Sequence, residues 1–190
     1  MIEAEMKARV RDPDALHQQL RRLADGQESV YRDTYYDRPD RELTAGGREL
    51  RLRTIETDGR RESLLTYKEA AVDAASGSKP EHETQVTNPA AIDVLLRGLG
   101  LEHLVSFEKH TTNYRFTSQG RDMVATVVTV PELHGTFMEL ETMTGPESTD
   151  AALADVRAVL LGLGITDSDL TTEQYTEAVM KSRRIDHLRD

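Results

Sequence analysis

The sequence predicts an α+β fold in which an antiparallel sheet closes into an eight-stranded β-tunnel (a barrel) with helices packed on its outside. Three observations lead to this prediction. Apolar and charged residues alternate strictly in several segments, as in strands with one covered face. A unit of a Glu-x-Glu strand, a short turn with proline and an amphipathic helix occurs three times. Several strands also place like charges two residues apart on one face, which requires opposite charges nearby.

The first of these units lies at the start of the chain. Residues 2–10 alternate apolar and charged side chains and predict a strand. Asp12 and Pro13 then have the character of a helix N-cap and first helical position. Gly26 is expected to end this helix. The apolar stripe of the helix consists of Leu16, Leu20 and Leu23.

Three strand-like segments follow, at Ser29–Tyr36, Arg48–Ile55 and Arg61–Lys68. The last two are joined by the sequence Thr-Asp-Gly-Arg, which is a hairpin signal. The stretch 72–80 is rich in Ala, Ser and Gly and is predicted to be a flexible loop rather than a domain linker.

The second unit begins with a strand that carries Glu81 and Glu83. A helix after Asn88-Pro89 is expected next, closed by Gly100 and followed by strands at Leu104–Phe116 and Met123–Val130. Its apolar residues are Ile92, Leu95, Leu96 and Leu99.

The third unit starts at Phe137 and has Glu139 and Glu141 on its strand. A helix at about Ser148–Leu163 and a last helix at about Thr171–Leu188, capped by Thr171 or Thr172, complete the predicted elements. The repeats are irregularly spaced, so a solenoid is excluded and helices outside one antiparallel sheet are favoured.

Composition limits the classes of protein to which the chain can belong. Its 190 residues are enough for one domain with its own core, expected at 1–190 with a flexible tail at about 182–190. A formal net charge of −10 argues against nucleic acid or anionic membrane as partners and suits divalent cations. The absence of cysteine excludes disulfides and thiolate metal sites. Without a signal-like or membrane-spanning apolar run, the chain is expected to be cytoplasmic.

Charges of one sign share strand faces in a way that suggests a site. Such faces are usually the solvent-exposed sides of half-buried strands, and that interpretation stays open. If the sheet curls shut beneath helices that cover its apolar face, the same charges line one bore, wide enough for a small ligand. The candidate residues are Glu3, Glu5, Lys7, Arg51, Arg53, Lys68, Glu81, Glu83, Lys109, Arg115, Glu139 and Glu141.

A bore with so many charges is stable only when ligands match them. Carboxylate oxygens suit Mg²⁺ or Mn²⁺, which share their coordination shell with water and substrate phosphates. Arginine grips phosphate oxygens in bidentate fashion, and lysine acts as a point charge. The pattern therefore favours a divalent cation together with a polyphosphate.

Several short motifs, in this order, resemble the CYTH superfamily of triphosphate tunnel metalloenzymes, and most closely its class IV adenylyl cyclase-like group with thiamine triphosphatase relatives. The resemblance covers roughly residues 1 to 180. The motifs are Glu3-Ala-Glu5-Met-Lys7, Tyr35-Tyr36-Asp37, Glu49-Leu-Arg51-Leu-Arg53, Thr66-Tyr67-Lys68, Glu81-His-Glu83, Lys109, Gly135-Thr-Phe137-Met-Glu139-Leu-Glu141 and Thr172-Glu-Gln-Tyr175.

The resemblance implies a role for each candidate residue. The metal ligands it implies are Glu3, Glu5, Glu139 and Glu141. The triphosphate is expected to be held by Lys7, Arg51, Arg53, Lys68 and Lys109, with Glu81 and Glu83 on the acidic side of the tunnel. Arg115, on the same face as Lys109, is added as a substrate-binding residue. The residues expected to act in catalysis are Lys7, Arg53 and Lys68.

Two positions depart from the family pattern. Where members carry an Asp that helps to hold a metal or orient the attacking group, this chain has Thr129. The second base of the sixth strand is replaced by Thr111. Arg115, four residues further along on the same face, could substitute, but four residues span about 13 Å along a strand. Single-metal chemistry, a different phosphorylated substrate or loss of catalysis therefore remain open.

The resemblance implies a Mg²⁺- or Mn²⁺-dependent enzyme acting on the triphosphate of ATP or a similar organic triphosphate, with cyclic AMP and pyrophosphate as products. Two alternatives stay open. One is a triphosphatase acting on thiamine triphosphate, a nucleoside triphosphate or tripolyphosphate, and the other is a non-catalytic nucleotide- or polyphosphate-binding domain. The expected partner is a small-molecule triphosphate, with neither nucleic acid nor membrane, and a homodimer is left open.

Overall fold

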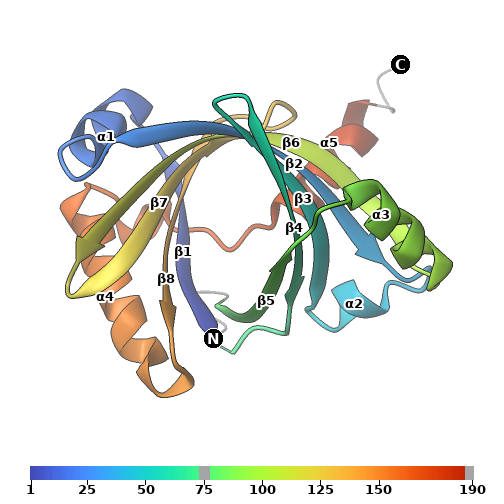
Figure 1. The fold of residues 1–190 in the computed structure, drawn as a ribbon. Coiled ribbons are helices and arrows are strands. Elements are labelled where there is room, and N and C mark those ends of the chain that lie inside the picture. The colour runs from blue at the N-terminus through green and yellow to red at the C-terminus, as the bar shows by residue number, and fades with distance from the viewer. Residues whose placement is uncertain (73–77, 187–190) are drawn as a thin grey trace.

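The computed structural model describes residues 1–72 and 78–186, and its centre is a closed antiparallel barrel of eight strands (Figure 1). Around the barrel the strands follow the order β1-β5-β4-β3-β2-β6-β7-β8. The predicted closed eight-stranded tunnel is thereby confirmed. The strands are β1 (Ile2–Val10), β2 (Gly26–Asp37), β3 (Glu49–Thr57), β4 (Arg60–Lys68), β5 (Lys79–Gln85), β6 (Glu102–Ser118), β7 (Arg121–Thr129) and β8 (Thr136–Thr144).

The helices lie outside the barrel wall, as the sequence predicts (Figure 1). They are α1 (Pro13–Leu20), α2 (Glu42–Ala45), α3 (Pro89–Gly98), α4 (Thr149–Gly162) and α5 (Tyr175–Asp186). The side chains of Asp12 and Asn88 cap α1 and α3 by accepting hydrogen bonds from backbone N–H groups, and a proline follows each cap. Among the described residues, no helix is both long and apolar enough to cross a bilayer.

The main apolar core lies between the outer face of the barrel and the helices α1 and α4. Leu16 and Leu20 of α1 pack there with Val156 and Leu160 of α4. The wall contributes outward-facing residues from four strands, namely Ala8, Tyr114, Met123, Ala125, Val127, Met138 and Leu140. Because period-two alternation sends these apolar side chains outward, their polar neighbours in the sequence must point into the barrel.

The barrel closes through a long seam on one side of β1 and a short one on the other. β1 pairs with β8 along its whole length, from Ile2↔Thr144 to Val10↔Thr136. With β5 it pairs only at Ile2↔Pro80 and Glu3↔Lys79. Closure therefore depends on the few residues that bring the start of β5 against the start of β1.

The first predicted helix ends earlier than expected. α1 stops at Leu20, and Leu23 is exposed rather than part of the apolar stripe. Gly26 does not end the helix but begins β2, where an added Cβ would lie 2.8 Å from the ring of Tyr114. The glycine at this position is required by close packing rather than by a helix stop.

The helix predicted around residue 95 forms, but most of its apolar side is not covered. Val94, Leu95 and Leu99 are exposed, and no residue of α3 is fully buried. The amphipathic pattern predicted the helix correctly and its burial incorrectly, because the barrel wall beside α3 meets only part of its apolar side.

The last helix begins at Tyr175 rather than at Thr171, so neither Thr171 nor Thr172 is its N-cap. Leu170 bridges to Ala8, and the backbone N–H of Thr171 donates to the carbonyl oxygen of Lys7 at 2.9 Å. The segment before α5 is thus bound as an extended chain to β1, which prevents it from being helical. Figure 1 shows this segment crossing the far side of the barrel between α4 and α5.

Two predicted flexible stretches are only partly described. The predicted loop 72–80 contains residues 73–77, which lie outside the described residues, while Lys79 and Pro80 belong to β5. In the predicted tail 182–190, residues 182–186 belong to α5 and 187–190 lie outside the described residues.

Replacing Leu160 with Ala should lower the free energy of unfolding by about 2 to 4 kcal/mol, because it removes a fully buried side chain from the core beneath α4. The neighbouring Leu161→Ala is a matched control, since Leu161 is 53% exposed and should change stability by less than about 0.5 kcal/mol. Urea titrations of both variants measure the difference. Equal losses would contradict the position of this core.

Candidate active site in the barrel bore

The interior of the barrel is a cavity lined by charged side chains. Residues paired across neighbouring strands share a face, and one such row around the wall runs Lys7↔Glu139, Glu139↔Thr126 and Thr126↔Asn113. The charged side chains that line the cavity are Glu3, Glu5, Lys7, Glu49, Arg51, Arg53, Lys68, Lys79, Glu81, Glu83, Lys109, Arg115, Glu139 and Glu141. The strands therefore bring charges from distant parts of the sequence into one space.

Three carboxylates form the acidic cluster of the bore. Glu3, Glu5 and Glu141 each offer an oxygen, and these oxygens all lie within 4.8 Å of one another. Burial together with Glu139 and Glu3 raises the pKa of Glu5 to about 7. Burial, Glu3 and Glu5 likewise raise the pKa of Glu141 well above its usual value. The carboxylates thus resist ionisation in the absence of a cation.

Glu139 lies among cations rather than with this cluster. Its Oε1 is 4.0 Å from the Nζ of Lys109. Burial alone would raise its pKa, but Lys109 and Lys7 outweigh burial and lower it. Of the four predicted metal ligands, the structure therefore groups three and places Glu139 beside the cationic wall.

The cationic wall is built around Arg51, Arg53 and Lys109. Asp33 holds Arg53 in place with two hydrogen bonds of 2.7 Å, and the ring of Tyr31 lies 4.4 Å from the guanidinium carbon of Arg53. Burial alone would raise the pKa of Asp33, but Arg53 lowers it far below the usual range. Arg53 is thus presented to the cavity in a fixed orientation.

Arg51 has unused hydrogen-bonding capacity. One of its terminal nitrogens donates to the hydroxyl of Thr66 at 3.3 Å. Its buried Nε has no hydrogen-bond partner among the described residues. A buried guanidinium N–H without an acceptor is costly, so an anionic oxygen in the cavity would be favourable there.

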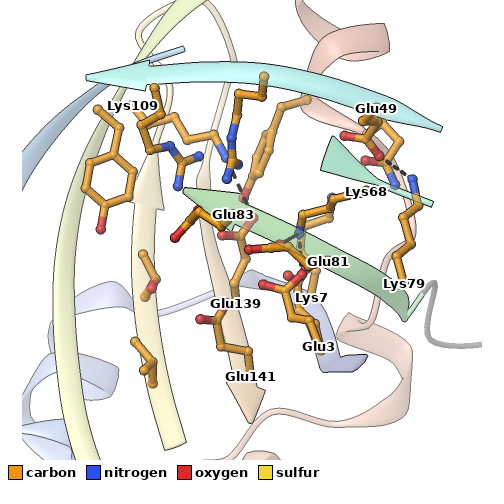
Figure 2. Close-up of a pocket in the computed structure, with 18 of the residues that line it drawn as sticks. Glu3, Lys7, Glu49, Lys68, Lys79, Glu81, Glu83, Lys109, Glu139 and Glu141 are labelled. Carbon is orange, nitrogen blue, oxygen red and sulfur yellow. Dashed lines mark hydrogen bonds and ion pairs between the residues drawn. The ribbon is translucent and has the colours of Figure 1, made fainter. Parts of the chain in front are cut away.

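Lysines connect the acidic cluster to β4 and β5. Lys68 forms ion pairs with Glu3 and with Glu81, the latter at 2.9 Å. Lys79 of β5 pairs with Glu49 of β3, on the two strands that flank β4. Figure 2 shows these side chains converging from separate strands on one space, with the Lys79–Glu49 pair to one side of it.

The segment before α5 contributes to the bore. Tyr175 is buried, and its ring lies 4.5 Å from the Nζ of Lys7 and 4.1 Å from that of Lys109. Thr171, Thr172 and Gln174 also line the cavity. Burial lowers the pKa of Lys109 to about 8, although Glu139 partly opposes this effect. The aromatic ring between the two lysines partly compensates for the water they have lost.

All the candidate residues predicted from the sequence line this cavity. Their individual roles stay predictions. The sequence reasoning gave no site role to several further lining or supporting residues, among them Tyr31, Asp33, Tyr35, Glu49, Lys79, Asn113 and Tyr175. Glu49 and Lys79 each lie two residues before a predicted site residue, so their phase could have identified them. Tyr175 ends the Thr172-Glu-Gln-Tyr175 motif, but that motif does not indicate that the C-terminal segment brings its side chain to the bore.

Thr129, the position compared with a family Asp, does not line the tunnel. It pairs with His110 on the outer face and is exposed. The inward residues of β7 are Val124, Thr126 and Val128, because they pair with Glu141, Glu139 and Phe137. The described part of the bore therefore receives no carboxylate from β7.

The other departure, Thr111, is buried, and its hydroxyl donates to the backbone oxygen of Ser29 at 3.1 Å. It is hydrogen-bonded within the wall and does not line the charged cavity. Arg115, expected to share the face of Lys109, does line the cavity.

The acidic cluster fits a hard divalent cation. Three oxygen donors within 4.8 Å match the ligand preference of Mg²⁺ and Mn²⁺. The raised pKa values of Glu5 and Glu141 also favour a cation site, because a bound cation would offset the repulsion between carboxylates that contributes to them. Glu3, Glu5 and Glu141 are thus the residues that could hold the metal.

Fold and site together define a class of protein, a closed antiparallel tunnel whose bore holds a carboxylate cluster facing a cationic wall. The chain belongs to the CYTH family, because the CYTH domain model matches residues 1–175. A curated relative, a putative adenylate cyclase of Methanocaldococcus jannaschii, is 25% identical over 93% of this chain and 98% of its own length.

Solved structures share the fold over nearly the whole chain. PH1819 protein from Pyrococcus horikoshii has a TM-score of 0.80 and 23% identity, covering 94% of this chain and 98% of that one. A putative adenylyl cyclase from Hippeastrum, described as having a dominant triphosphatase activity, has a TM-score of 0.63 and 18% identity, covering 95% and 96%. At these identities the similarity shows the fold alone.

Replacing Glu5 with Gln should stabilise the metal-free protein at pH 8 by roughly 2 kcal/mol. The pKa of Glu5 is raised to about 7, so the folded state loses stability as pH rises from about 4.5 through 7 and the carboxyl is forced to ionise. The gain should therefore vanish near pH 4. Urea unfolding in EDTA at both pH values measures it, with the exposed Glu102→Gln as control. A gain that is equal at both pH values would contradict the buried, repelled state of Glu5.

Asp33→Asn should lower the free energy of unfolding by about 2 to 4 kcal/mol at pH 7, because it leaves the buried charge of Arg53 unpaired. The pKa of Asp33 is depressed, so its contribution is present above about pH 4 and is lost at lower pH. Glu56→Gln removes a solvent-accessible partner of Arg32 and Arg61 and should lower the free energy of unfolding much less than Asp33→Asn does. Similar losses in both variants would refute the special position of Asp33.

Proposed function

We propose that the protein is a divalent-metal-dependent enzyme that acts on the triphosphate of ATP or a similar organic triphosphate inside the tunnel. Its proposed reaction is like that of a class IV adenylyl cyclase, ATP giving cyclic AMP and pyrophosphate. The proposal rests on one observation, that Glu3, Glu5 and Glu141 gather in the same closed cavity as the cationic wall of Arg51, Arg53 and Lys109. In this proposal residues 1–190 act as one CYTH domain.

Each half of the bore suits one part of a metal–triphosphate complex. The carboxylates of Glu3, Glu5 and Glu141 hold Mg²⁺ or Mn²⁺, which neutralises charge on phosphate oxygens when bound. Arg53 is held by Asp33, and Arg51 has an Nε–H without an acceptor among the described residues, so both are ready to donate to phosphate oxygens. Such fixed donors are the main source of rate enhancement in phosphoryl transfer.

In the cyclase reaction the ribose 3′-oxygen attacks the α-phosphorus and loses its proton to water. The bond between this phosphorus and the oxygen bridging to the β-phosphate breaks, and pyrophosphate leaves with the electron pair. Lys7, Arg53 and Lys68 are proposed to stabilise the charge that develops on the phosphates during this step. Lys109 and Arg115 then hold the phosphate chain in position.

A triphosphatase reaction is the second candidate. The observation that favours it is the Hippeastrum structure, a putative adenylyl cyclase whose dominant activity is described as triphosphatase. Here water would attack the terminal phosphorus with the same residues holding the chain. The absence of a carboxylate on the inward residues of β7, Val124, Thr126 and Val128, motivates the third alternative, a domain that binds without turnover.

An assay of products from ATP, thiamine triphosphate and tripolyphosphate, with Mg²⁺ or Mn²⁺, distinguishes these reactions. Cyclic AMP with pyrophosphate is the expected result, and release of phosphate would identify the triphosphatase. Glu141→Gln and EDTA should each lower the rate by about 100-fold or more, because both remove the cation from the phosphates.

The exposed Glu102→Gln is the control and should retain the full rate. Turnover that is unaffected by Glu141→Gln and EDTA would refute the metal-dependent tunnel reaction. Metal-dependent binding of all three compounds without any product would favour the non-catalytic alternative.

A further inference from the structure

The lysines of the bore differ in what holds their ammonium groups. Lys68 is paired with two carboxylates, those of Glu3 and Glu81. Lys79 is likewise paired with the carboxylate of Glu49. Ion pairs with carboxylates on neighbouring strands therefore fix the positions of these two ammonium groups.

Lys7 and Lys109 are buried in the same bore but are held differently. The Nζ of Lys7 donates to the backbone oxygen of Glu173, which carries no full charge. The Nζ of Lys109 lies 4.0 Å from the Oε1 of Glu139, which is too long for a hydrogen bond. Both ammonium groups lie against the ring of Tyr175, at 4.5 and 4.1 Å from its centroid. An ammonium group has three N–H donors, so each lysine keeps donors for a ligand.

The chain that leads to Tyr175 is bound to β1. β8 pairs with one edge of β1 throughout, whereas β5 reaches the other edge only at the start of the strand. Further along that second edge, Leu170 forms a bridge with Ala8. The N–H of Thr171 donates to the carbonyl oxygen of Lys7 at 2.9 Å. The backbone of this segment therefore has a fixed position directly beside Lys7.

The helix that follows Tyr175 is anchored as well. In α5, Arg183 donates hydrogen bonds of 2.6 and 2.9 Å to the carboxylate of Glu132. Val179 is fully buried in the apolar cluster that contains Phe137. The ring of Phe137 meets that of Tyr175 edge-on, with 5.3 Å between the centroids. The ring of Tyr175 is thus fixed from both directions along the chain.

A fixed ring between two lysines limits where their ammonium groups can go. The stem of a lysine is long and flexible. Lys7 lies two residues after Glu5 on the same face of β1, so its ammonium group could swing to the acidic cluster, as that of Lys68 does. Attraction to the ring, about 0.5 to 2 kcal/mol for each ammonium group, opposes this movement. Both charges then stay beside the cationic wall, and the acidic cluster stays free for a metal ion.

We propose that Tyr175 is a positioning residue of the tunnel site, whose ring keeps the ammonium groups of Lys7 and Lys109 in place to receive the phosphates of the substrate. This inference rests on the proposed function and adds to it a residue that acts through the two lysines. The ring performs this task rather than the hydroxyl, so phenylalanine can replace tyrosine and an aliphatic side chain cannot. The C-terminal segment is thereby a working part of the site.

Calorimetric titration in Mg²⁺ tests the proposal with an ATP analogue in which methylene groups replace both bridging oxygens of the triphosphate. Tyr175→Leu should weaken binding by about 10-fold, because both ammonium groups lose the ring. Tyr175→Phe should bind within about 2-fold of the wild-type protein, because it keeps the ring. Tyr175→Met repeats the test with a longer apolar side chain and takes the place of Tyr175→Leu if that variant does not fold.

Val179→Ala is the matched control for packing. It removes buried apolar atoms from the same helix and the same apolar cluster but leaves the ring of Tyr175 in place. It should therefore lower the free energy of unfolding and change the affinity for the analogue by less than about 2-fold. Urea unfolding of each variant measures stability separately from binding.

A second experiment tests whether Tyr175 acts through the lysines. In a Lys109→Met background, Tyr175→Leu should weaken binding by a smaller factor than in the wild-type background, because one of the two ammonium groups that the ring holds is gone. Equal factors in both backgrounds would overturn the proposal.

The outcomes of the first experiment separate this inference from the proposed function. If Tyr175→Leu leaves binding unchanged, or Tyr175→Phe weakens it as much as Tyr175→Leu does, the positioning role of the ring is wrong and the proposed function stands. A loss of affinity in Val179→Ala equal to that in Tyr175→Leu would also overturn the role, since packing alone would then explain it. If the wild-type protein does not bind the analogue, the proposed function fails and the inference fails with it.

Discussion

Three carboxylates, those of Glu3, Glu5 and Glu141, have to share one enclosed space with their oxygens within 4.8 Å of one another. Like charges so close in a poorly hydrated bore repel strongly, and the raised pKa values of Glu5 and Glu141 express that repulsion. Lys68 compensates only in part, since it divides its charge between Glu3 and Glu81. The site is therefore costly for the fold when metal-free, and the surrounding structure has to supply the stability that the site removes.

The barrel supplies this stability by separating two apolar regions from the charges. The larger core lies outside the wall, beneath α1 and α4, where the outward side chains of the strands are buried. The smaller one lies at one end of the bore, where Tyr35, Phe107 and Phe137 pack with residues of α5. Between them, most strands point charged residues inward without losing apolar contacts on their other face. A site of this kind needs a closed sheet, because an open one would expose the same charges to bulk water.

Much of this arrangement could be predicted from the sequence because strand alternation has an exact period of two. Within a single strand, alternation shows which side chains share a face. It grouped Glu3 with Glu5, Arg51 with Arg53 and Glu139 with Glu141, and all six line the bore. The place of Thr129 in the motif order does not indicate which face of the sheet it takes, and its side chain is exposed on the outer face. The pairing of β7 with β8 decides which residues of β7 face the bore. The residues between the two strands are not in a strand, so alternation cannot be counted through them. The burial of α3 was overestimated for a related reason, since an apolar stripe indicates a helix but not the size of the surface that covers it.

The sequence by itself determined the strands, their two faces and the family to which the motifs point, because these depend on neighbours within a few residues. Only the tertiary structure decided which charges meet. Lys68 reaches Glu3 across 65 residues of sequence, and Lys7 meets the segment at Glu173 across 166. The separation of Glu139 from the other carboxylates, the support of Arg53 by Asp33 and the plugging of one end by Tyr175 likewise follow from barrel closure. Such contacts arise from register and strand order, which no local pattern encodes.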